Sequence, residues 1–151
     1  MGQLFGSIYC WFENLFGIEL ANYLWGQSSP EQTGNSFIGI GLITIVISLI
    51  IAVLFYFIFC RREWNNFWAW LIAAGVNAVI NLIIGWQWVL YDLNAGKMYK
   101  LNEAGEKIQL MVDGGNCWQF GFANLFISIL FFVIISLILK WKSPDCEHAP
   151  F

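Results

Sequence analysis

Residues 37–59 read FIGIGLITIVISLIIAVLFYFIF and contain no charged side chain. A helix of about 20 apolar residues crosses the ~30 Å hydrocarbon core of a bilayer, because each residue adds ~1.5 Å along the helix axis. Residues 67–91 and 119–139 are two further uncharged stretches of sufficient length. The sequence therefore predicts an all-α integral membrane protein with three transmembrane helices, over residues 37–60, 67–91 and 119–139.

The composition excludes two other classes of protein. Hydrophobic residues make up 59% of the 151-residue chain and charged residues only 11%, whereas soluble domains carry about 25% charged residues. The net charge is −3 and the few Lys and Arg residues form no basic stripe, which argues against a nucleic-acid surface. We therefore expect the lipid bilayer as a partner, and no nucleic acid.

Basic residues indicate the orientation in the membrane. Four stand directly at the ends of the first and third spans: Arg61, Arg62, Lys140 and Lys142. The three on the other side lie several residues from the nearest span: Lys97, Lys100 and Lys107. Basic residues next to spans favour the cytoplasm, so we expect the N-terminus outside and the C-terminus inside the cell (inner or plasma) membrane. Residues 61–66 then form a short cytoplasmic turn, 92–118 an extracytoplasmic loop and 140–151 a cytoplasmic tail.

Residues 1–26 are apolar and aromatic but carry one narrow polar stripe at helical spacing. Its members are Gln3, Gly6, Ser7, Cys10, Glu13, Asn14, Gly17 and Ala21. The pattern predicts an amphipathic helix in the membrane interface, joined to the first span by a linker over residues 27–36. A fourth span is the alternative, which would place Glu13 and Asn14 near mid-bilayer. If the helix plugs a pore, the candidate gating residues are Cys10, Glu13 and Asn14.

The loop between the second and third spans contains two short extended runs, residues 97–101 and 107–112. They flank a turn-forming segment over residues 102–106 and precede Asp113, Gly114 and Gly115, so we expect a small β-hairpin closed by these three residues. Because an isolated hairpin is marginally stable in water, its apolar side chains need a partner surface.

Each predicted span carries a stripe of small and polar residues on one face. Those singled out are Thr44, Ser48, Ala74, Asn77, Ala78, Asn81, Asn124 and Ser128. In lipid, small residues allow close helix approach, and amides form hydrogen bonds between helices. One interpretation is that the stripes hold the three helices of one chain together. In the other, Asn77 and Asn81 are repeated around a symmetry axis and line a pore, which requires a homo-oligomer.

No residue pattern points to catalysis. The chain has no HExxH, GxSxG or P-loop motif, and its single histidine, His148, lies in the last residues beside Cys146. The spans contain no charged residue of the kind that relays protons or binds coupling ions. We therefore expect no enzyme activity, no cofactor and no metal site.

In the proposed orientation Cys10 and Cys117 lie outside, where disulfides form. We therefore consider a Cys10–Cys117 disulfide, with two unrelated buried thiols as the alternative.

Two functional hypotheses follow from these features. The first is a homo-oligomeric channel or pore-forming membrane effector that a regulatory partner controls, with the N-terminal helix as its gate. The second is a non-catalytic structural, assembly or immunity subunit that binds a second membrane protein through the small and polar helix faces.

Overall fold

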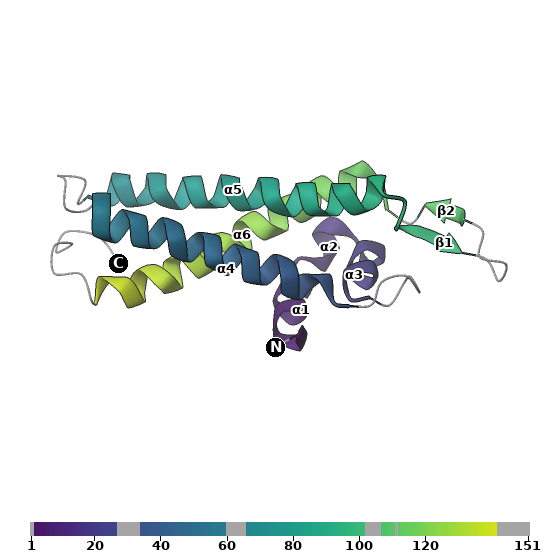
Figure 1. Ribbon diagram of the computed structural model, residues 1–151, viewed down its shortest axis with the longest axis horizontal. Helices are drawn as coiled ribbons and strands as arrows, with labels where there is room; N and C mark the ends of the chain where they lie inside the picture. The colour runs from purple at the N-terminus through teal and green to yellow at the C-terminus, as the bar shows by residue number, and fades with distance from the viewer. Residues whose placement is uncertain (1, 27–33, 60–65, 102–106, 111, 142–151) are drawn as a thin grey trace.

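Three long helices form the body of the protein (Figure 1). The computed structural model describes residues 2–26, 34–59, 66–101, 107–110 and 112–141. The long helices are α4 (Ser36–Leu54), which continues into the π-helix η1 (Phe55–Phe59), α5 (Phe67–Asn94) and α6 (Gly114–Lys140). Each is long and apolar enough to cross a membrane, so the prediction of three candidate spans is confirmed.

Several predicted segments fall partly outside the described residues. They are residues 27–33 of the linker, 61–65 of the cytoplasmic turn, 102–106 and 111 of the hairpin, and 142–151 of the tail. Arg61, Arg62, Lys142, Cys146 and His148 therefore lie outside the described part of the chain.

A polar side chain caps the start of each long helix. Asn35 accepts a hydrogen bond from the Phe37 N–H at 2.9 Å, and Asn66 accepts one from the Ala69 N–H at 2.8 Å. Asp113 forms a capping box with Asn116, which satisfies N–H groups that the first turn leaves unpaired. This cap starts α6 at Gly114 rather than at residue 119, so Gly114 and Gly115 begin a helix instead of closing a hairpin.

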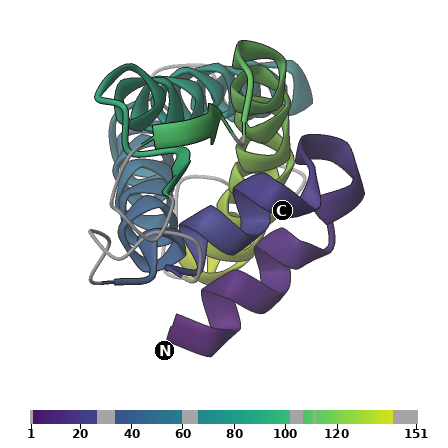
Figure 2. The same ribbon diagram turned by 90° about the vertical axis from the view of Figure 1, so that its right-hand side faces the viewer.

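The three long helices pack around a common interior, and α5 and α6 approach closely where glycine replaces a side chain. A Cβ on Gly85 would lie 2.9 Å from the Asn124 Cβ, and one on Gly121 would lie 3.0 Å from the Leu82 carbonyl oxygen. Viewed along the bundle, α4, α5 and α6 surround this interior, and the N-terminal helices cover the side between α4 and α6 (Figure 2).

The N-terminal segment is three short helices rather than one: α1 (Gly2–Cys10), α2 (Glu13–Phe16) and α3 (Ile18–Leu24). The chain leaves the helical path after Cys10 and again at Gly17, whose φ of 92° suits a residue without a Cβ. These breaks let the segment fold around the end of the bundle, so its aromatic residues reach α4 and α6.

The end of the bundle beside α3 also carries two strands, β1 (Tyr99–Leu101) and β2 (Lys107–Leu110), which pair antiparallel. Tyr99 is opposite Leu110, and the register is irregular between Lys100 and Leu101. Met98 and Val112 are buried in the main hydrophobic core, so the chain on either side of the strand pair is fixed to the bundle.

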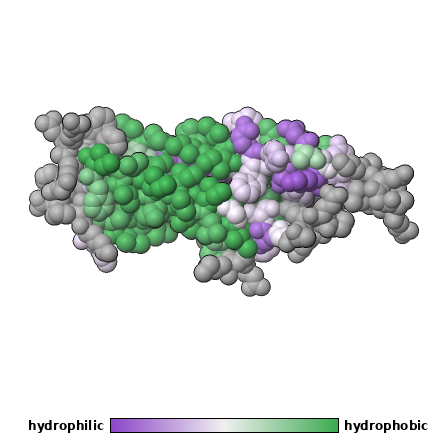
Figure 3. Space-filling model, viewed as in Figure 1, coloured by the Kyte–Doolittle hydropathy of each residue, from purple (hydrophilic) through white to green (hydrophobic). Residues whose placement is uncertain are grey.

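The surface changes character along the bundle. Apolar residues cover the half around α4 and η1, and hydrophilic residues gather at the end with α3 and β1 (Figure 3). On α5, exposed Trp68 and Trp88 lie about 30 Å apart at the usual helical rise, close to the thickness of a hydrocarbon core. Aromatic residues at both ends of such a band are typical of membrane interfaces.

Candidate functional site

The stripes of the three spans meet in a polar core inside a single copy of the chain. The six polar residues of these stripes have 0% exposed surface: Thr44, Ser48, Asn77, Asn81, Asn124 and Ser128. Ala74 and Ala78 are buried beside them. The structure thus places all eight residues that the sequence singled out on the spans in the interior of one copy.

The polar core has several levels, which are groups of polar side chains at successive positions along the bundle axis. Asn124 is the centre of the first level. Its Oδ1 accepts hydrogen bonds from the Tyr9 hydroxyl at 2.5 Å and from the Thr44 hydroxyl at 3.0 Å. Its Nδ2 donates to the Asn81 carbonyl oxygen at 2.7 Å. One carboxamide therefore connects α1, α4, α5 and α6, and in a dry interior such bonds between helices stabilise their packing.

The second level lies one helical turn further along. Asn81 Nδ2 donates to the Asn77 carbonyl oxygen at 3.0 Å and to Asn77 Oδ1 at 3.1 Å. Asn77 Nδ2 donates to the Ser128 carbonyl oxygen at 3.0 Å, and the Ser128 hydroxyl donates to the Leu125 carbonyl oxygen at 2.7 Å. The amides on α5 thus form a directed series of bonds that ends on the backbone of α6.

A third polar contact lies near the other end of the bundle. The Trp70 indole Nε1 donates to the Ser136 hydroxyl at 3.3 Å, and the Trp70 ring packs against Phe132. Ala74 and Phe132 belong to the apolar cluster at this end. The polar core therefore follows the bundle axis for several turns, with apolar packing between its levels.

Tyr9 is the residue of this site that the sequence did not indicate. Its ring stacks between Phe37 at 5.1 Å and Phe120 at 5.5 Å, and burial raises the pKa of its phenol. A tyrosine pairs an apolar body with a polar tip, so it suits a buried position next to an amide. It directly precedes Cys10 in α1 and is not a member of the polar stripe from which gating residues were predicted.

Among the described residues, the hydrogen bonds of the polar core include none of the predicted gating residues, and their gating role stays a prediction. Cys10 is half-buried, and its sulfur accepts a hydrogen bond from the Trp25 Nε1 at 3.4 Å. Glu13 is half-buried in the first turn of α2, and Asn14 is exposed.

Close packing fixes this segment to the bundle. A Cβ on Gly41 would overlap the ring of Phe5, and one on Gly6 would overlap the ring of Trp25. Asn116 Nδ2 also donates to the Phe16 carbonyl oxygen at 2.8 Å. Residues 2–24 therefore form a fitted wedge between α4 and α6, which we call the N-terminal wedge.

Cys10 and Cys117 are both free thiols in the structure, so they do not form the disulfide that the sequence analysis considered. Cys10 faces Trp25, whereas the buried Cys117 donates to the Asp113 carbonyl oxygen at 3.4 Å inside the first turn of α6. The two cysteines thus have separate surroundings, as the alternative of two unrelated thiols describes.

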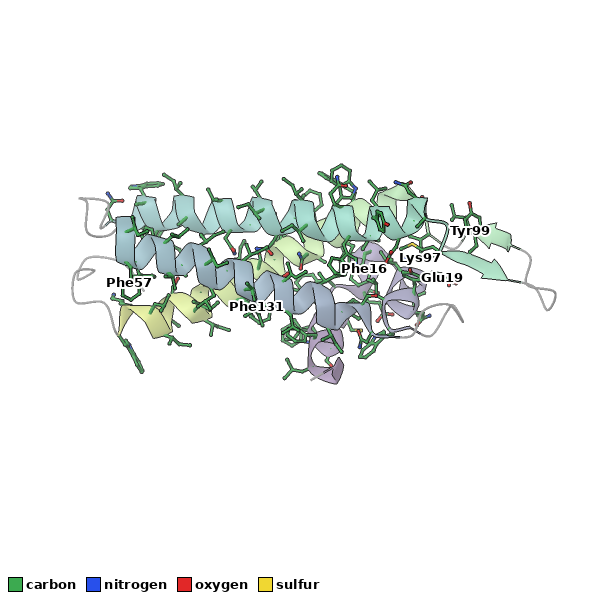
Figure 4. All side chains as sticks on the ribbon, in the orientation of Figure 1. Phe16, Glu19, Phe57, Lys97, Tyr99 and Phe131 are labelled. Atoms are coloured by element: carbon green, nitrogen blue, oxygen red, sulfur yellow. The ribbon has the colours of Figure 1, made fainter. Side chains whose placement is uncertain are left out.

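A second polar cluster fixes α3 to the end of α5. The Asp92 carboxylate lies 2.8 Å from the Lys97 Nζ, and Tyr23 forms a side-chain hydrogen bond with Asp92. Burial, followed by the negative charge of Asp92, raises the pKa of the Tyr23 phenol. Figure 4 shows Glu19 and Lys97 at this end, far from Phe57 at the opposite end of the bundle. The cluster joins two elements and resembles a structural ion pair.

Within the described part of the chain, no group of three His, Cys, Asp or Glu side chains is arranged to hold a metal ion. Comparison with known proteins adds no family assignment: neither a protein-family model, nor a curated protein, nor a solved structure matches the chain.

Proposed function

We propose that the protein is a non-catalytic membrane subunit that binds another protein at the end of the bundle bearing α3 and β1. The observation that supports this is the burial of the whole polar core within one copy. A pore lined by these residues, or a partner bound through them, would need them to be accessible. Among the described residues on the face that Figure 3 shows, hydrophilic surface gathers at the end of the bundle with α3.

The outward faces of the long helices suit lipid. They carry large apolar side chains that are at least one third exposed, among them Leu42, Val46, Ile50, Ile72, Val79, Ile83, Phe126, Leu130 and Ile134. Tight association of membrane helices normally uses small or polar residues, and these faces offer few of them. We infer that the long helices act as an anchor in the bilayer.

We also propose that the N-terminal wedge lies at the outer membrane interface. Leu4, Trp11, Leu15 and Ile18 are exposed on it, next to the level at which Trp88 marks one end of the apolar band. We keep the predicted orientation, N-terminus outside and C-terminus in the cytoplasm of the cell membrane.

Orientation is tested by single cysteines in a cysteine-free variant. A membrane-impermeant maleimide added to intact cells should label a cysteine at Asn14 but not one at Trp141. The same reagent should label both positions after permeabilisation. Labelling of Trp141→Cys alone in intact cells would show that the orientation is the opposite of the one proposed.

The binding role is tested by site-specific photocrosslinking in native membranes. A photoreactive residue at Tyr91 or Ile18, both exposed at the α3 end, should give an adduct with a different protein. The matched positions Ile72 and Val79, exposed on the outer face of α5, should give lipid adducts only. Crosslinked oligomers of the protein, formed from the photoreactive residue at Val79, would contradict the proposal.

A channel or pore-forming effector is the second candidate, and one observation favours it. The polar core extends along the bundle axis, and its Asn124 level is covered on one side by the N-terminal wedge. Displacement of the wedge by a partner would expose Thr44 and Asn124 for assembly of a homo-oligomer. In planar bilayers, wild-type protein should then be silent, and a variant lacking residues 2–24 should conduct. Silence of both would remove this candidate.

A further inference from the structure

Two polar atoms in the middle of the bundle have no hydrogen-bond partner among the residues that the structure describes: Ser48 Oγ and Asn81 Oδ1. Both side chains have 0% exposed surface. A buried oxygen without a partner is unfavourable, and inside a hydrocarbon layer no bulk water relieves it. These two atoms therefore require a physical explanation.

The hydrogen bonds of neighbouring residues, together with the helical rise, place Ser48 and the side chain of Asn81 at one level of the bundle. Thr44, Asn124 and Asn81 share the first level, because the Asn124 carboxamide bonds to both of the others. Ser48 follows Thr44 by one helical turn, about 6 Å along α4. In the antiparallel α5, Asn77 is displaced from Asn81 by the same turn in the same direction.

The second level is closed by the bond from Asn77 Nδ2 to the Ser128 carbonyl oxygen. The carboxamide of Asn81 is turned towards this level, because its Nδ2 donates to both oxygens of Asn77. Ser48, Ala78 and Ser128 are all small side chains buried on its three helices. The unpaired oxygens of Ser48 and Asn81 thus belong to one small, uncharged level midway between Trp68 and Trp88.

We propose that this level binds one water molecule, which donates one O–H to Asn81 Oδ1 and accepts a hydrogen bond from the Ser48 hydroxyl. The chemistry of the two atoms identifies the ligand: a carboxamide oxygen only accepts, and a hydroxyl both donates and accepts. A buried water typically makes two to four such bonds. The absence of charge favours a neutral ligand. This inference depends on neither proposed function.

The first test is the sign of a stability change. If a water bridges the two atoms, Ser48→Ala removes one of its partners, and the folding equilibrium constant in bilayers should fall about threefold to tenfold. If Ser48 Oγ is simply unpaired, its removal should leave that constant unchanged or raise it. Ser128→Ala is the matched control, because it deletes the same atom from a hydroxyl whose partner is known.

The second test detects the water directly, and its main measurement uses the wild-type protein. In proton-detected solid-state NMR of the wild-type protein in bilayers, magnetisation from water should reach the Asn81 side-chain amide. It should not reach the Asn124 amide equally fast, since both ends of that carboxamide are bonded to protein. Ser48→Ala should weaken the Asn81 signal. An Asn81 amide as silent as that of Asn124, or a Ser48→Ala variant as stable as wild type, would overturn the proposal.

Discussion

Replacing Asn124 by leucine tests whether the polar core holds one copy together. Leucine has the same branched shape as asparagine, so the substitution removes three hydrogen bonds with little change in packing. Bonds of this kind in membranes average about 0.6 kcal/mol and reach about 1.7 kcal/mol. Leucine also leaves the Tyr9 hydroxyl unpaired in an apolar setting, which adds to the cost. We expect a loss of about 2–4 kcal/mol in the free energy of unfolding.

The assay is reversible unfolding by SDS from mixed micelles, followed by tryptophan fluorescence. Asn14→Leu is the matched control, because Asn14 is exposed on α2 and the same change there should alter stability by less than about 0.5 kcal/mol. The reactivity of the half-buried Cys10 thiol provides a local measure, since release of the N-terminal wedge should increase it. Equal stability of Asn124→Leu and wild type would refute the reasoning. A loss that depends on protein concentration would assign the bonds to contacts between copies instead.

The other predictions concern the wedge and the Tyr23 cluster. In the same SDS assay, Gly41→Ala should destabilise the fold by about 1–3 kcal/mol, because the new methyl group overlaps Phe5. Gly75→Ala should stabilise the fold by about 0.5–1 kcal/mol, because the added Cβ meets nothing within 4 Å. Burial and Asp92 raise the pKa of the Tyr23 phenol in the folded state, so its contribution to stability is complete below about pH 10, the unfolded value, and is lost as the pH rises further. Between pH 9 and 11, the free energy of unfolding should therefore fall less in Tyr23→Phe than in wild type. An equal fall in the two proteins would show that the Tyr23 phenol does not cause this pH dependence.

The three spans were predictable because their signal is local. Residues 37–59 need no knowledge of the rest of the chain to be recognised as a span, since length and lack of charge suffice. The inward faces were also predictable, because an amide such as Asn77 or Asn124 is costly against lipid and must find a polar partner. Composition and periodicity thus determine both the elements and the sides that face protein.

The N-terminal segment was not predictable in this way. Its stripe around Cys10 and Glu13 has helical period, but the chain departs from the helix after Cys10 and at Gly17. A single tyrosine among many aromatic residues gives no periodic signal, although Tyr9 reaches Asn124 across 115 positions of sequence. Such a contact depends on the position of three other helices, and no window of sequence contains them.

Assembly of several copies through the polar faces would have a definite free-energy cost. Each copy would first break the bonds from Tyr9 and Thr44 to Asn124 and remove Phe5 from Gly41. New contacts between copies would have to replace these before any net gain appeared, because an amide exposed to lipid is unfavourable. Such assembly is therefore coupled to release of the N-terminal wedge: a partner that binds the released wedge would favour oligomers, and one that binds the folded end would favour the single copy. The two proposed functions thus differ in the state of residues 2–24 when a partner is bound.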